Sequence, residues 1–270
     1  MQPTADISFT INERKLAFQL THDATSSVDR DIITCMNQFG CPEPEVMHLL
    51  VRVLRPGDFA IDGGANVGFF TLVMSQLVGE YGIVLAVEPG ENNLPKLTAN
   101  LRLNKVKNVE VCNRPLWSSN DDVTLYYSPH GGYNSLSESV HTLGKKTLQG
   151  IQLSTWHSTP RLIKLDIEGS EEHALRGATK HLVNSVPYIV CEMNIPALRA
   201  LGSTQESLRK FMRDWGYSTF LLFREGHLPC LVPEKTLIFE AADSNGTVNV
   251  LFSTVEKVAN VWPRAVLKYV

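Results

Sequence analysis

The sequence has little of what marks nucleic-acid-binding, membrane-spanning or disulfide-rich proteins. Its 270 residues hold 25 Lys and Arg against 28 Asp and Glu, so a formal net charge of −3 leaves no basic excess for DNA, RNA or acidic membranes. No apolar run reaches the ~18 residues that a membrane-spanning helix needs. The five cysteines are scattered and form no C-x-x-C pair, which argues against a zinc site or a disulfide framework and favours reduced thiols in a cytoplasm.

The beginning of the chain also lacks the basic region and the apolar stretch of a secretory signal. These absences together predict a cytoplasmic protein with no membrane segment and no nucleic-acid partner, and they leave its oligomeric state open. A hydrophobic content of 43% and a charged content of 20% are typical of a globular chain that buries a sizeable core. The length fits one large α/β domain with a small extension.

The stretch at 59–70, F-A-I-D-G-G-A-N-V-G-F-F, organises the chain. Residues 59–61 are typical of the end of a buried strand, and apolar residues at helical spacing predict a helix over 67–78. The glycines between them permit a sharp turn and a close approach to a ligand, and the helix N-terminus offers free N–H groups to a nucleotide. A second buried strand at 84–87 ends in Glu88, whose carboxylate can accept hydrogen bonds from both hydroxyls of a ribose.

The order of the glycines separates two cofactor classes. A dinucleotide fold requires G-x-G-x-x-G, but Asn66 lies two positions after Gly64 and Phe69 occupies the place of the third glycine. Asp62 would repel a pyrophosphate, whereas it would favour the amino group of a methionyl moiety. The motif therefore favours S-adenosylmethionine (SAM) over NAD. The candidate cofactor-binding residues lie in this turn, just after the second strand, in the 113–118 loop that could flank an adenine ring, and at the end of a later strand: Asp62, Gly63, Gly64, Ala65, Asn66, Gly68, Glu88, Pro89, Leu116 and Asp166.

Strand and helix patterns alternate along the rest of the chain. We expect a hairpin at 7–12 and 16–21, and later strands at 109–112, 123–127, 161–166, 188–191, 217–224 and 248–252. We expect helices at 26–39 and 43–54, which could form a lid, at 92–103 and 171–183, and after a capping box at 203–206. This alternation predicts a three-layer α/β fold with a mainly parallel sheet and an antiparallel last strand pair. The expected division is an N-terminal extension (1–55), a cofactor-binding core (56–252) and a C-terminal tail (253–270).

Four acids each lie at or just past the end of an expected core strand: Asp62, Glu88, Asp166 and Glu192. Because parallel strands end at one edge of a sheet, these side chains should converge on one crevice. Methyl transfer to a hydroxyl needs an aligned acceptor and a group that takes its proton. Asp166 is the first candidate for that base or for binding the methionyl amino group, and Glu168 and Glu192 are candidates for holding the acceptor.

One histidine joins this set, because His130 lies in a glycine-rich loop beside Tyr133 and Asn134. The candidate catalytic residues are therefore Asp166, Glu168, Glu192 and His130. Asp166 with Glu192 could instead coordinate a divalent cation, but no D-D pair or histidine cluster accompanies them, so we assign no metal ligand.

Four segments together resemble the FkbM-type SAM-dependent methyltransferases. They are P-G-D-F-A-I-D-G-G-A-N-V-G-F-F-T (56–71), V-E-P (87–89), H-G-G-Y-N-S-L (130–136) and L-I-K-L-D-I-E-G-S-E (162–171). The resemblance implies a class I, Rossmann-like fold with seven strands, SAM as methyl donor, and O-methylation of a hydroxyl on a glycan or secondary metabolite. It implies cofactor contacts at Asp62, Gly64, Asn66, Gly68 and Glu88, and a D-x-E-G signature at Asp166 and Glu168.

The resemblance leaves the acceptor open, and the 113–118 loop departs from the small residues that are usual there. Two alternatives remain at this point: an NAD-dependent oxidoreductase, and a non-catalytic module that binds SAM or a nucleotide.

Overall fold

The computed structural model describes residues 3–21, 27–128, 134–138, 142–156, 158–222, 229–233, 236, 238 and 246–262. His130, Tyr133 and His157 lie outside these residues. Among the helices described, none is both long and apolar enough to cross a membrane.

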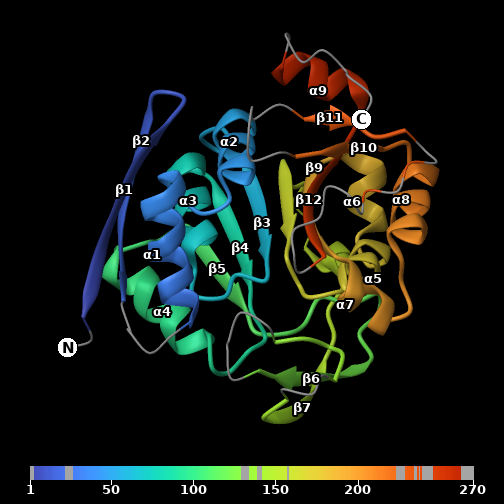
Figure 1. The fold of residues 1–270 in the computed structure, drawn as a ribbon, viewed down its shortest axis with the longest axis horizontal. Helices are drawn as coiled ribbons and strands as arrows, with labels where there is room; N and C mark the ends of the chain where they lie inside the picture. The colour runs from blue at the N-terminus through green and yellow to red at the C-terminus, as the bar shows by residue number, and fades with distance from the viewer. Residues whose placement is uncertain are drawn as a thin grey trace.

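A mainly parallel sheet forms the centre of the described chain (Figure 1). Its eight strands are β3 (Phe59–Gly63), β4 (Ile83–Val87), β5 (Val109–Cys112), β8 (Leu162–Leu165), β9 (Tyr188–Asn194), β10 (Ser218–Leu221), β11 (Cys230–Leu231) and β12 (Thr247–Ser253). They lie in the order β11-β10-β12-β9-β8-β3-β4-β5. Five neighbouring strands pair in parallel, in the order β5, β4, β3, β8 and β9. Strand β12 is antiparallel to both β9 and β10. This confirms the predicted Rossmann-like α/β class and the antiparallel last pair.

The expected count of seven strands is wrong by one. The additional strand, β11, has two residues and pairs with the edge of β10. Two residues are too few to show an alternating pattern, so the sequence gives no signal for it.

Helices cover both faces of the sheet, which makes the three predicted layers (Figure 1). On one face lie α2 (Pro44–Val53), α3 (Phe69–Val78) and α4 (Leu94–Leu103), and on the other lie α5 (Glu171–Arg176), α6 (Thr179–Asn184), α7 (Ile195–Ala200) and α8 (Gln205–Asp214). Successive strand residues face opposite sides, as in any strand. In β3, Ala60 packs in the cluster with α3, and Ile61 packs in the cluster with α5 to α8.

The predicted N-terminal hairpin and helices are confirmed. Strands β1 (Thr4–Ile11) and β2 (Arg14–Thr21) pair antiparallel around Asn12 and Glu13, and α1 (Ser27–Phe39) follows. The rings of Phe9 and Phe18 lie 6.3 and 5.3 Å from the ring of Phe69 in α3. The hairpin therefore shares one hydrophobic cluster with the sheet and α3, and a domain boundary at residue 55 stays a prediction.

Three local expectations are corrected by the structure. The single helix expected at 171–183 is broken into α5 and α6 at Gly177, where a Cβ would lie 2.3 Å from the carbonyl oxygen of Trp117. The capping box of α8 is formed by Thr204 and Ser207, one residue later than predicted, with a Ser207 N–H to Thr204 Oγ1 distance of 3.1 Å. The C-terminal tail contains α9 (Val255–Val261), which the sequence analysis did not place.

The segment between β5 and β8 forms a small separate sheet. Strand β6 (Asp122–Tyr127), which was predicted, pairs antiparallel with β7 (Gly144–Gln149), which was not. The two strands lie below the carboxyl ends of the central strands in Figure 1, where they border the pocket described next.

Candidate functional site

The turn from β3 to α3 requires glycine at Gly64. This residue has φ 81°, and a Cβ on it would lie 1.8 Å from the carbonyl oxygen of Asp166. No other residue can occupy this position without displacing the end of β8. The N–H groups of Gly64 and Ala65 donate to the carbonyl of Val87 at 2.9 and 3.0 Å. The turn is thus fixed against the ends of both β4 and β8.

Glu88 faces this turn from the end of β4. Its Oε2 accepts from the backbone N–H of Asn66 and its Oε1 from that of Gly90, each at 2.8 Å. Burial raises the pKa of Glu88 to about 7, against the opposing effect of these hydrogen bonds. Each carboxylate oxygen has two lone pairs, so both can still accept from a ligand hydroxyl.

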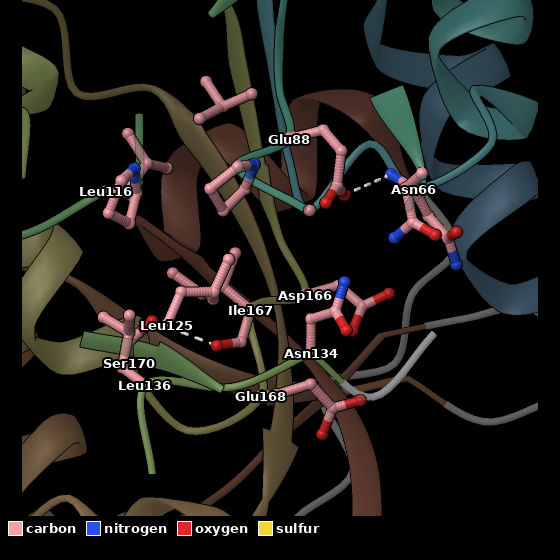
Figure 2. Close-up of a pocket in the computed structure, with 15 residues that line it drawn as sticks. Asn66, Glu88, Leu116, Leu125, Asn134, Leu136, Asp166, Ile167, Glu168 and Ser170 are labelled. Carbon is pink, nitrogen blue, oxygen red and sulfur yellow. Dashed lines mark hydrogen bonds between the residues drawn. The ribbon is translucent and has the colours of Figure 1, made fainter. Parts of the chain in front are cut away.

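A pocket lies between these two elements (Figure 2). It encloses about 60 Å³ within an open concavity of about 570 Å³. Seven predicted site residues line it: Gly64, Asn66, Glu88, Pro89, Leu116, Asp166 and Glu168. Asn66 Oδ1 is buried there without a hydrogen-bond partner among the described residues. The pocket thus combines a carboxylate, an unsatisfied amide oxygen and an apolar wall.

Other predicted residues support the pocket without lining it. Gly63, Ala65 and Gly68 form the backbone of the turn, and Gly68 begins α3 with φ 91°. Asp62 is fully buried, and its Oδ2 accepts from Thr71 Oγ1 at 2.5 Å. This hydrogen bond joins the end of β3 to α3, so it fits a role in holding the two elements together.

Lys164 is a site residue that the sequence analysis missed. Its side chain is buried in β8, and its Nζ lies 3.1 Å from Asp166 Oδ2 and 4.7 Å from the ring centroid of Phe70. Burial lowers the pKa of Lys164, but the charges of Asp166, Asp62 and Glu43 outweigh burial and raise it. The sequence did carry a signal for this residue, because a lysine within an otherwise apolar strand is buried and a buried amine needs anionic partners nearby.

The paired cation keeps Asp166 ionised. Burial alone would raise the pKa of Asp166, but Lys164 and a hydrogen bond from Glu192 hold it below its usual range. The pKa of Glu192 is raised well above its ordinary value by burial and by the charge of Asp166. The opposite directions of these two pKa shifts favour one proton on the pair, with Asp166 as the ionised partner.

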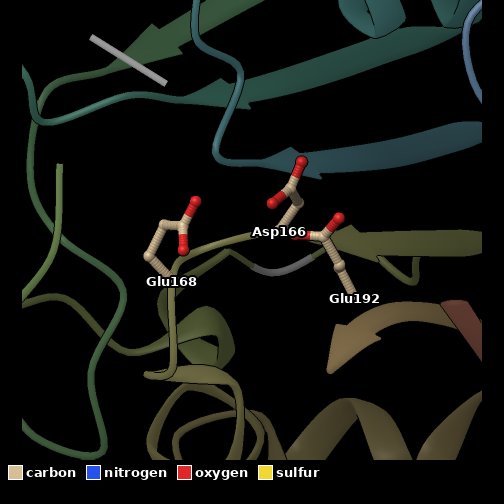
Figure 3. Close-up of side chains that lie close together, drawn as sticks. All are labelled: Asp166, Glu168 and Glu192. Atoms are coloured by element: carbon tan, nitrogen blue, oxygen red, sulfur yellow. The ribbon is translucent and has the colours of Figure 1, made fainter. Parts of the chain in front are cut away.

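Glu168 completes a group of three carboxyls with Asp166 and Glu192 (Figure 3). Each offers an oxygen within 4.8 Å of the others. Glu168 has φ 51°, and its Oε2 accepts from Asn194 Nδ2 at 3.1 Å. Burial, followed by the charge of Asp166, raises the pKa of Glu168 to about 8. Its protonation therefore changes in the neutral to mildly basic range.

Three oxygens at this spacing match the ligand type that Ca²⁺ and Mg²⁺ take. Here Lys164 and the proton shared with Glu192 already compensate Asp166. The absence of a metal ligand stays a prediction.

The N-terminal segment adds a further acid that sequence reasoning missed. Glu43 precedes α2 in a left-handed conformation, with φ 41°. Asn249 Nδ2 of β12 donates to Glu43 Oε2 and to Glu45 Oε1, both at 3.1 Å. The charge of Glu43 raises the pKa of Lys164, the partner of Asp166. The N-terminal segment that was predicted as a possible lid therefore influences the charges around Asp166.

Asn134, in the segment before β7, lines the pocket and is held there by two hydrogen bonds. Its Nδ2 donates to Asn92 Oδ1 at 2.7 Å, and its Oδ1 accepts from the Ser128 N–H at 3.0 Å. Asn93, Leu125 and Ser170 also line the pocket, and the sequence analysis did not name them as site residues. They come from three separate segments, so only the fold brings them together.

The raised pKa values predict that the protein without ligand loses stability as the pH rises. Burial is the largest cause at Glu43, Glu88 and Glu171, each raised to about 7, and at Glu168, raised to about 8. A carboxyl with a raised folded pKa contributes stability below its unfolded pKa, and that contribution is lost as the pH passes through the folded value. His181 opposes the trend, since burial lowers its pKa.

The four buried carboxyls outweigh the single histidine. The Tm at pH 8.5 should therefore lie below the Tm at pH 5.5 by roughly 5 °C or more. Scanning calorimetry at matched ionic strength measures this difference, and Glu43→Gln should reduce it. A Tm that rises from pH 5.5 to 8.5 would contradict the burial of these carboxyls.

The model of the methyltransferase FkbM domain matches residues 62–219, which is more than half of the 270 residues. The chain belongs to this family. The match confirms the resemblance carried by the four sequence segments, and it favours methyl transfer over the NAD-dependent alternative. The matched range contains the β3–α3 turn, Glu88 and the three carboxyls of this FkbM-type methyltransferase domain.

Three known proteins resemble parts of the chain. Hexuronic acid methyltransferase AglP of Haloferax volcanii is 28% identical over 158 residues, which are 56% of this chain and 62% of that relative. The FkbM methyltransferase from Methylobacillus flagellatus is 16% identical with a TM-score of 0.44, over 83% of this chain and 60% of that one. A SAM-dependent methyltransferase from Aquifex aeolicus is 14% identical with a TM-score of 0.47, over 84% and 95% of the two chains. The family assignment rests on the family model alone.

Proposed function

We propose that the protein transfers a methyl group from SAM to a hydroxyl of a glycan or secondary-metabolite acceptor. The observation that carries this is the pocket in which Glu88, fixed by two backbone N–H groups, faces the Gly64 turn. Membership in the FkbM methyltransferase family supports the reaction class. The name of the relative from Haloferax volcanii supports a sugar acceptor.

The pocket residues fit the cofactor by chemistry. Glu88 can accept from both ribose hydroxyls, and the unpartnered Oδ1 of Asn66 offers a further acceptor. Leu116 and Pro89 supply apolar surface for the adenine ring. Asp166, kept anionic by Lys164, suits the cationic amino group of the methionyl moiety better than it suits a base, because a low pKa makes a weak base.

The bound cofactor supplies an electrophilic methyl group on a sulfonium. Glu168 takes the proton of the acceptor hydroxyl, because its pKa of about 8 matches a base that works near neutral pH. The protonated Glu192 donates its hydrogen bond to Asp166, and its remaining oxygen can accept from a hydroxyl of the acceptor. His130 keeps its predicted catalytic role, and the cytoplasmic location and the lack of a nucleic-acid partner also stay predictions.

Binding of S-adenosylhomocysteine (SAH), the demethylated product, tests the cofactor assignment. Isothermal calorimetry should show one site on the wild type. Glu88→Gln should weaken it roughly 5- to 150-fold, as expected for ~1–3 kcal/mol lost when a buried polar partner is removed. Glu110→Gln, which changes an exposed acid on β5, is the matched control and should bind like the wild type. Absence of SAH binding to the wild type would refute the proposed function.

A further inference from the structure

A second concavity lies at the opposite end of the sheet from the cofactor pocket. The hairpin turn, the end of α2, the start of β9 and helix α9 surround it, and these elements lie together at the top of Figure 1. It is an open groove of about 750 Å³. Pockets of this size accommodate small organic ligands.

The groove is strongly basic in an otherwise slightly acidic protein. Five cationic side chains line it: Arg14, Arg52, Arg55, Arg161 and Lys257. The acidic side chain among the described residues that line the groove is Glu13, which is exposed at the hairpin turn. No ion pair involves any of the five cations in the part of the chain that the structure describes.

Two of these cations lie over the ring of Tyr188, which is 3% exposed at the start of β9. Arg161 Cζ and Lys257 Nζ lie 5.6 and 5.1 Å from the centroid of its ring. Burial raises the pKa of Tyr188, and the charges of Arg161 and Arg55 oppose this rise. Burial and the charge of Arg161 lower the pKa of Lys257. The cations thus act on one another across a small volume.

Their donors have few acceptors within the protein. Arg55 Nη1 donates to the carbonyl of Leu54 at 2.8 Å, and Lys257 Nζ donates to the carbonyls of Val186 and, at 3.5 Å, Ser185. Arg52 Nε is buried and has no hydrogen-bond partner among the described residues. Guanidinium groups present paired donors that match the oxygens of phosphate, so an unpaired set of them is suited to that ligand.

We propose that this groove binds a ligand that carries two or more phosphate groups. Each phosphate brings up to two negative charges and several acceptor oxygens, so two of them balance the converging cations. This groove is separate from the cofactor pocket, so the proposal does not depend on the identity of the methyl donor. The phosphates can come from a free polyphosphate ester or from phospholipid head groups, which offer the same chemistry.

Titration calorimetry of the full chain with tripolyphosphate at constant ionic strength tests the proposal. We expect one site on the wild type. The double variant Arg55→Gln, Arg161→Gln should bind at least about tenfold more weakly, as expected when charge-assisted hydrogen bonds are lost. The control variant, Lys107→Gln with Lys180→Gln, also removes two positive charges, but from exposed positions outside the groove. It should keep the wild-type affinity. SAH binding and the Tm should be unchanged in both, because all four side chains are exposed.

Co-sedimentation with vesicles identifies the source of the phosphate. Binding to vesicles that contain phosphatidic acid, but not to neutral vesicles, with loss in the Arg55, Arg161 variant, would support head groups as the ligand. Binding of tripolyphosphate without binding to either kind of vesicle would support a free ligand. Two results would overturn the proposal: no binding of either probe, or equal loss of binding in both double variants.

Discussion

Replacing Glu168 with Gln is expected to lower turnover by about 10²- to 10⁴-fold, the usual contribution of a positioned general base. The amide keeps the size of the side chain and its contact with Asn194, but it cannot take a proton from the acceptor. SAH affinity should stay close to that of the wild type, because the ribose and methionyl contacts come from other residues. Turnover is measured as SAH released in the presence of uronic-acid-containing oligosaccharides.

The pH profile separates this role from a structural one. Since the pKa of Glu168 is raised to about 8, the basic form accumulates as the pH rises, and wild-type turnover should increase up to about pH 8 and then level off. Glu138→Gln, an exposed acid in the 134–138 segment, is the matched control and should keep both the rate and the profile. An unchanged rate in the Glu168 variant would exclude Glu168 as the base.

Lys164→Met should destabilise the protein by about 3–5 kcal/mol, as is typical when one partner of a buried ion pair is removed. Methionine has a similar length and fills the same space, so little of the loss should come from packing. The loss arises because the buried Asp62 and the partly buried Asp166 would be left without their cation. Urea unfolding measures the change. Lys146→Met is the control, since it breaks the exposed pair with Glu91 and should hardly change the midpoint.

The sign of the pH dependence tests the electrostatic origin of this loss. Without Lys164 the folded pKa of Asp166 should rise above its unfolded value. Protonation then restores stability at low pH, and the deficit grows as the pH rises through the new folded pKa. The deficit of the variant should therefore be larger at pH 8 than near pH 4. An equal deficit at both pH values would show that lost packing, rather than charge, is responsible.

Local patterns were enough to predict where the β3–α3 turn and Glu88 lie, while their role in binding the cofactor stays a prediction. The glycines of the β3–α3 turn and Glu88 at the end of β4 are placed by strand and helix periods and by the parallel topology, so their positions follow from the sequence. The same topology brings Asp166 and Glu192 to one edge of the sheet, and their oxygens do lie within 4.8 Å.

Contacts between distant segments could not be predicted in this way. Glu43 reaches the neighbourhood of Lys164 only because α2 packs against the sheet and Asn249 of β12 holds its carboxyl. Gly177, between α5 and α6, leaves no room for a Cβ because it lies against the carbonyl of Trp117, which is 60 residues away in the sequence. The pairing of β6 with β7 and the groove around Tyr188 likewise have no local pattern.

The claim that the Gly64 turn and Glu88 hold an adenosyl group is tested most directly by a crystal structure of the complex with SAH. We predict that both ribose hydroxyls donate to the Glu88 carboxylate, that the adenine lies against Leu116, and that the amino group lies beside Asp166. A structure in which SAH binds outside this pocket, or in which Glu88 contacts no part of it, would contradict the account.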